Sequence, residues 1–163
     1  MHHRLSIFKL SRFVQVLIAL SVVSPVLAQD AKESSDWPQF QGLNRNGISL
    51  ETGIAREWPE GGPRELWSVP LGEGFGGAAV RDGEVYIVDR VSDAQDVVRC
   101  LSLKTGKELW SYAYDAPGKV SYPGSRTTPT VTEQYVFSVG VRGDFYCIDR
   151  KTHKRVWHVN LVD

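Results

Sequence analysis

Short apolar runs bounded by turn-forming residues follow one another from residue 65 onward. The runs at 85–88 and 135–139 are too short for helices and are rich in β-branched and aromatic residues. Asp82-Gly83, just before the first run, is a favoured dipeptide for a two-residue hairpin turn. The pattern therefore predicts short antiparallel strands joined by tight turns.

This strand pattern occurs twice. Residues 100–110, Cys-Leu-Ser-Leu-Lys-Thr-Gly-Lys-Glu-Leu-Trp, recur at 147–157 with the Cys, the Lys-Thr pair and the final Trp in register. Four short strands in a repeat of about 40–50 residues are typical of a β-propeller blade. We predict an all-β fold with a leading strand at about 65–70, a first blade at about 77–81, 84–90, 97–103 and 107–114, and a second at about 127–132, 135–140, 144–150 and 154–160.

The number of repeats predicts an incomplete ring. A propeller needs about four to eight blades, whereas this sequence provides two blades, about 77–114 and 127–160, and one leading strand. We expect that strand to complete the last blade of the ring. Residues 64–163 are therefore interpreted as part of a longer propeller, of which this is an N-terminal fragment. Assembly of several short chains into one ring is the alternative.

Residues 1–28 have the pattern of a secretory signal peptide: a basic start, an apolar run at 13–23 and small or aliphatic residues before Ala28. The apolar run is shorter than the ~20 residues that span a membrane. We predict cleavage after Ala28 and a periplasmic or otherwise exported product without a stable membrane span. Residues 29–63 are predicted to form an N-terminal arm that packs its aromatic residues on the body.

Charge and the cysteines narrow the possible functions. Removal of residues 1–28 leaves 16 basic against 19 acidic residues, and a mildly acidic protein is a poor candidate for nucleic-acid binding. Cys100 and Cys147 hold equivalent repeat positions, which a packed layer separates by more than the ~7 Å that a disulfide can bridge. We predict two buried free thiols.

The repeats resemble the pyrroloquinoline-quinone (PQQ) repeat, whose blade ends on Ala-x-Asp-x-x-Thr-Gly-Lys-x-x-Trp. The first copy matches at Thr105, Gly106 and Trp110, and the second at Thr152 and Trp157, with a histidine in place of the glycine. The opening Asp-Trp-Pro-Gln-Phe-Gln-Gly at 36–42 is similar to the leader of exported bacterial PQQ-like propellers.

The resemblance implies that Trp67, Trp110 and Trp157 pack between neighbouring blades, an arrangement called tryptophan docking. The turn position of Gly106 is predicted to require a positive φ, which glycine adopts freely and histidine tolerates. These residues are interpreted as structural and not as a ligand platform, because buried aromatic side chains mostly pack.

No catalytic or metal-binding residue is predicted. Gly72–Gly77 matches the dinucleotide pattern G-x-G-x-x-G, but a β-hairpin and not a helix is expected to follow it. Asp89, Asp93 and Asp96 fit no calcium-loop spacing and are interpreted as a solvated acidic turn.

The long connection at 111–126 is the candidate site, because long ordered loops usually carry function. Antiparallel strands place it on the same rim as the 90–96 loop. Tyr122, Arg126 and Thr127 are the predicted rim residues, near the central funnel; a lid packed on the neighbouring blade is the alternative.

Two functions follow from the resemblance. The favoured hypothesis is an exported protein-binding or scaffold module without a cofactor, similar to outer-membrane assembly proteins, whose partner is another protein or the missing propeller blades. The alternative is a PQQ-dependent alcohol or sugar dehydrogenase, which would hold PQQ and calcium in its funnel.

Overall fold

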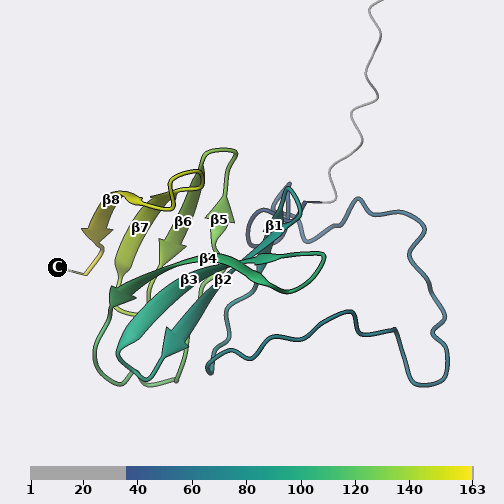
Figure 1. Ribbon diagram of the computed structural model, residues 1–163, viewed down its shortest axis with the longest axis horizontal. Helices are drawn as coiled ribbons and strands as arrows, with labels where there is room; N and C mark the ends of the chain where they lie inside the picture. The colour runs from purple at the N-terminus through teal and green to yellow at the C-terminus, as the bar shows by residue number, and fades with distance from the viewer. Residues whose placement is uncertain (1–35, 163) are drawn as a thin grey trace, which may run out of the picture. The chain divides into compact units, whose positions relative to one another are not determined.

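The computed structural model describes residues 36–162, so the predicted signal peptide lies outside the described residues. Within this range, the strands form two four-stranded antiparallel sheets with the orders β1-β2-β3-β4 and β5-β6-β7-β8 (Figure 1). The strands are β1 (Ala79–Arg81), β2 (Glu84–Val91), β3 (Gln95–Ser102), β4 (Glu108–Asp115), β5 (Thr130–Val131), β6 (Tyr135–Val139), β7 (Asp144–Asp149) and β8 (Arg155–Asn160). Two sheets in which each strand pairs with its sequence neighbour are two propeller blades, as the sequence predicts.

Tight turns join the strands where the sequence places them. Asp82 and Gly83 have φ values of 53° and 77°, the conformation of a type I′ hairpin turn. Gly106 (φ 70°) and His153 (φ 59°) occupy the equivalent turns of the two sheets. The predicted positive φ at both positions is confirmed.

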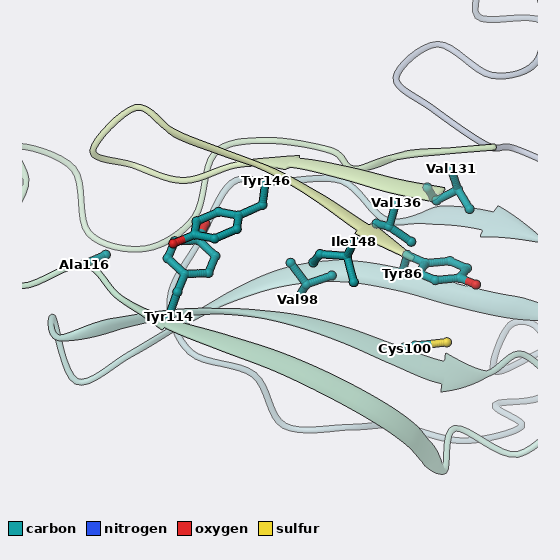
Figure 2. Close-up of a cluster of buried hydrophobic side chains, with 10 residues drawn as sticks. Tyr86, Val98, Cys100, Tyr114, Ala116, Val131, Val136, Tyr146 and Ile148 are labelled. Atoms are coloured by element: carbon teal, nitrogen blue, oxygen red, sulfur yellow. The ribbon is translucent and has the colours of Figure 1, made fainter. Parts of the chain in front are cut away.

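The core lies between the two sheets. The first sheet contributes Tyr86, Val98 and Cys100, each with no exposed surface, and the second contributes Val136 and Ile148, which are equally buried. Figure 2 shows these side chains between the sheets, with the Tyr114 and Tyr146 rings stacked at one end. Burial of apolar area between the sheets stabilises both, since neither sheet could cover this face alone.

The predicted leading strand at 65–70, expected to pair with the last blade of the ring, has no pairing partner among the described residues. This segment has no strand assignment, although Trp67 is half-buried and its indole Nε1 donates a hydrogen bond to the Leu103 carbonyl (2.8 Å). A strand needs a hydrogen-bonded neighbour along its edge, and the described residues contain no strand that pairs with 65–70. The tryptophan holds the segment in place without a ladder.

The arm pairs with the inner strands, which the sequence did not predict. Trp37 exchanges two backbone hydrogen bonds with Val80 of β1 (both 2.9 Å), and the Val131 amide of β5 donates to the Pro38 carbonyl (2.8 Å). The arm therefore bridges the inner edges of both sheets. Its other aromatic residues do not all pack as expected, because Phe40 is 68% exposed and Trp58 is 58% exposed.

Candidate functional site on the loop rim

Two connections meet on one rim of the sheets. The β2–β3 turn and the loop after β4 are joined by backbone hydrogen bonds from Ala116 to the Ala94 carbonyl and from Gly118 to the Asp93 carbonyl (both 2.8 Å). The predicted placement of these two connections on the same rim is confirmed. The antiparallel order of the strands causes it, since alternate connections lie at the same end of a sheet.

A buried ion pair anchors this rim. The Arg90 guanidinium donates to the Asp96 carboxylate (2.8 Å), and both side chains are almost completely buried. Arg90 also donates to the carbonyls of Ala116 and Gly118 (2.9 and 2.7 Å), and Asp96 accepts from the backbone amide of Val141 (3.1 Å). The pair therefore links the turn, the long loop and the second sheet.

The interpretation of these aspartates as a solvated turn is wrong for two of the three. Asp96 is fully buried, and Asp89 is 4% exposed and ion-paired with Arg99 (2.8 Å). The Gly72 amide also donates to Asp89 (2.8 Å). The two carboxylates can be buried because each forms an ion pair with an arginine. The spacing of residues along the sequence does not reveal these ion pairs. Only Asp93 is exposed.

A second loop crosses the rim at close range. The Phe75 amide donates to the Ser125 carbonyl (2.6 Å), and Gly74 forms an isolated parallel bridge with Ser125. A Cβ at Gly124 would overlap the Glu73 carbonyl, so the two backbones leave no room for a side chain there. The glycines of the 72–77 stretch serve this crossing, and a strand, not a helix, follows them.

Phe75, Tyr122 and Arg126 form an exposed group on the crossing, here called the rim cluster. Phe75 is 72% exposed and Tyr122 is 65% exposed, and their rings lie edge to face with centroids 6.4 Å apart. The guanidinium carbon of Arg126 lies 5.7 Å from the Tyr122 ring centre, and Arg126 donates to the Tyr122 carbonyl (2.9 Å). Sequence reasoning selected Tyr122 and Arg126 but missed Phe75, which lies far from them along the chain.

Thr127 has a positioning role in the structure. Its hydroxyl donates to the Val139 carbonyl (2.6 Å), which ties the end of the loop to β6. A groove of about 790 Å³ lies beside it. Arg126 is the only charged residue among those that line this groove: Trp37, Phe40, Gln41, Gly47, Phe75, Gly77, Ala78, Arg126, Thr127, Thr128, Thr130, Phe137, Val139 and Phe145.

Two of the three repeat tryptophans, Trp67 and Trp110, pack on the turns at the end of the sheets opposite the rim, whereas Trp157 packs on the Phe137 and Phe145 rings. The Trp67 ring lies over Gly106, where an added Cβ would come within 2.7 Å of it. Trp110 stacks on the His153 ring with centroids 4.8 Å apart. Trp157 is 39% exposed. Trp67 therefore packs on the β3–β4 turn of the first sheet, and Trp110 packs on the β7–β8 turn of the second sheet.

Hydrogen bonds of threonines shape these turns. The Asp149 carboxylate accepts from the amide and hydroxyl of Thr152 (2.7 and 3.0 Å), and these bonds lower the pKa of Asp149. In the first turn, the Thr105 hydroxyl accepts a longer bond from the Lys107 amide (3.4 Å). Both threonines stabilise local turns.

The predicted free thiols are confirmed, and both are buried. Burial raises the pKa of Cys100 to about 12 and also raises that of Cys147. A neutral thiol is a poor nucleophile and metal ligand. Among residues 36–162, no group of three or more His, Cys, Asp or Glu side chains could hold a metal ion, and no helix is long and apolar enough to cross a membrane.

The fold and its repeated tryptophan turns define a class, the PQQ-like β-propeller repeat proteins. The family model described as outer membrane protein assembly factor BamB matches residues 57–162, which is more than half of the chain. The chain belongs to this family.

A search of solved structures finds a similarity to a europium-containing methanol dehydrogenase. The sequences are 26% identical, the TM-score is 0.36, and the match covers 51% of this chain and 14% of that protein. Comparison with curated proteins gives no match.

Proposed function

We propose that this chain is part of an exported β-propeller that acts as a protein-binding or scaffold module, similar to outer-membrane assembly proteins. The observation that carries the proposal is the rim cluster, which exposes two aromatic rings and an arginine on a crossing fixed by backbone hydrogen bonds. Tyrosine and arginine are enriched where binding energy concentrates in protein interfaces. The family description supports the same role, and the predicted signal peptide would deliver the protein to the periplasm or another exported location.

The donor chemistry of the described residues supports a role without a cofactor. Of the three rim aspartates, Asp89 and Asp96 are engaged by arginines (2.8 Å each), and the exposed Asp93 lies 3.8 Å from the Arg90 guanidinium. The groove offers one cation and mainly aromatic and threonine side chains. Such a lining suits an apolar surface with an anionic group better than a hydrated metal ion.

The second sheet suggests a further contact. Its outward face carries Phe137, Phe145 and Trp157, whose rings pack on one another with centroids 5.1–6.4 Å apart. In the first sheet the same face is covered by the next blade. We expect a further propeller blade to cover this face, including the Phe137 and Phe145 side of the groove, which leaves the rim cluster as the surface for a separate partner.

Titration of PQQ with calcium into the purified full chain, followed by absorbance and by alcohol-dependent dye reduction, tests the proposed function. We expect no saturable quinone signal. In parallel, a photo-crosslinking amino acid at position 122 should give a discrete protein adduct in cells, whereas the same amino acid at exposed position 151 should not. Stoichiometric quinone binding with dye reduction would replace the scaffold function by the dehydrogenase function.

A further inference from the structure

The rim cluster has an electrostatic property that narrows its partner. Arg126 is exposed, and no ion pair joins it to a carboxylate in the described part of the chain. Its hydrogen bond goes to the neutral Tyr122 carbonyl, and its guanidinium stacks on that residue's ring. Arg90 and Arg99 of the first sheet are instead paired with aspartates, and Arg142 of the β6–β7 turn donates to the Lys119 carbonyl of the long loop (3.4 Å). Arg126 therefore keeps donors available for an anionic group.

The surroundings of Arg126 are apolar. Phe75 and Tyr122 flank it with most of their ring surface exposed, and the adjoining groove adds the aromatic rings of Trp37 and Phe40. A bare phosphate or other small anion would leave these rings uncovered. A ligand that matches both features carries a carboxylate directly beside an aromatic or large aliphatic group.

The cluster is also ordered before any partner binds. The backbone bonds from Phe75 and Gly76 to the Ser125 carbonyl (2.6 and 3.2 Å) fix both loops, and the Thr127 hydroxyl ties the loop to β6. Stacking on Tyr122 restrains the Arg126 side chain as well. Side chains that are ordered in advance lose less conformational entropy on binding, so a short segment is sufficient.

We propose that the rim cluster binds an extended polypeptide segment of a partner protein in which an aspartate or glutamate lies next to an aromatic or large aliphatic residue. The carboxylate accepts hydrogen bonds from the Arg126 guanidinium, and the neighbouring side chain packs on the exposed surfaces of the Phe75 and Tyr122 rings, which contact each other edge to face. This inference rests on the proposed scaffold function and names the chemistry of its partner.

Selection of a displayed library of short random peptides on the full chain tests the inference. Enriched clones should contain an acidic residue adjacent to Phe, Tyr, Trp or Leu. Their synthetic peptides should bind Arg126→Gln roughly tenfold or more weakly than the parent chain, because a charge-assisted hydrogen bond is lost. The double variant Phe75→Ser/Tyr122→Ser should lose binding further. Peptides with amides in place of carboxylates should reproduce the loss seen with Arg126→Gln.

Arg56→Gln is the matched control, since Arg56 is an exposed arginine of the arm, outside the rim, and this variant should bind like the parent chain. Circular dichroism should show that each variant stays folded, because the substituted side chains are exposed. A library without acidic-aromatic enrichment, or clones that bind Arg126→Gln as tightly as the parent chain, would overturn the inference. Either result leaves the scaffold function standing, whereas quinone-dependent dye reduction would remove that function without changing the peptide result.

Discussion

The two sheets have equivalent faces that lie in two different environments. In the first sheet, Tyr86, Cys100 and Trp110 are in register across β2, β3 and β4, and the second sheet covers them. In the second sheet, Phe137, Cys147 and Trp157 are in register in the same way. There the tryptophan is 39% exposed and the neighbouring Val159 is 48% exposed.

The difference shows that burial in this fold depends on the neighbouring unit and not on the strand itself. Both faces have apolar residues at the same positions, but on the face without a neighbour only Cys147 is almost fully buried, while the aromatic rings around it stay partly exposed. The core of a repeat architecture therefore forms between units, and the stability of a unit includes a term for each interface.

The rims of the two sheets differ as well. The first sheet has Arg90 and Asp96 facing one another across β2 and β3, whereas the same repeat positions in the second sheet are Val141 and Gly143. Only the first unit therefore anchors its long loop with a buried ion pair. The repeat conserves the tryptophan turns at one end and varies the loops at the other, where the rim cluster lies.

Truncation of the matched aromatic residues should give the largest contrast between the sheets. Tyr86→Ala should lower the free energy of unfolding by about 4–5 kcal/mol, because it leaves a cavity between the sheets. It also removes the hydroxyl that accepts a hydrogen bond from Arg150 (2.9 Å). Phe137→Ala should cost about 1–2 kcal/mol, since its ring is only half-buried. Urea unfolding followed by circular dichroism measures both values.

Tyr86→Phe separates packing from hydrogen bonding in that comparison. It keeps the ring and removes the hydroxyl, which donates to Glu84 and accepts from Arg150. A loss of about 1–2 kcal/mol is expected for this variant. Equal losses for Tyr86→Ala and Phe137→Ala would contradict the view that only the first face is a core.

Removal of one charge from the rim pair should give the next largest effect. Asp96→Asn should destabilise the chain by about 3 kcal/mol, because it leaves the Arg90 charge buried without its partner. The double variant Arg90→Met/Asp96→Leu should recover a large part of this loss, since it removes both charges. Thermal and urea unfolding check both expectations. If Asp96→Asn leaves the free energy of unfolding unchanged, the pair does not anchor the rim.

Most of the fold could be predicted from the sequence because local turn and strand patterns determine it, and these patterns occur twice. Asp82-Gly83 fixes one hairpin, and the shared turn at Gly106 and His153 fixes the end of each unit. The site could be predicted only in part. Phe75 joins Tyr122 and Arg126 through a crossing of two loops, and Asp96 meets the Val141 amide across the sheets. Such contacts depend on the packing of units, which no local pattern encodes.

Exchange of the turn residues should give a smaller effect that tests tryptophan docking. Gly106→Ala should cost about 1–3 kcal/mol, because its φ of 70° is unfavourable for alanine and the new Cβ would press on the Trp67 ring. His153→Gly should change stability by less than about 1 kcal/mol, since relief of the positive φ offsets the lost ring stacking on Trp110. Thermal unfolding distinguishes the two variants. If Gly106→Ala leaves the thermal stability unchanged, Trp67 does not pack closely on this turn.

Thiol labelling should reveal the smallest difference between the two sheets. Burial raises the pKa of Cys100 to about 12, so at pH 8 only about one thiol in ten thousand is the reactive thiolate. Its reaction with iodoacetamide should be slow and should become faster as the pH rises toward that pKa. The pKa of Cys147 is raised by the same cause, and Cys147 is itself only 2% exposed. No second sheet covers its face in the described residues, so a smaller opening should expose it and its labelling should be the faster of the two. Mass spectrometry of peptides from the native chain measures both rates, with the urea-unfolded chain as the control in which the rates become similar. If Cys100 is labelled first, the covered face of the first sheet opens more readily than the uncovered face of the second. That result would contradict the claim that the second sheet protects the first.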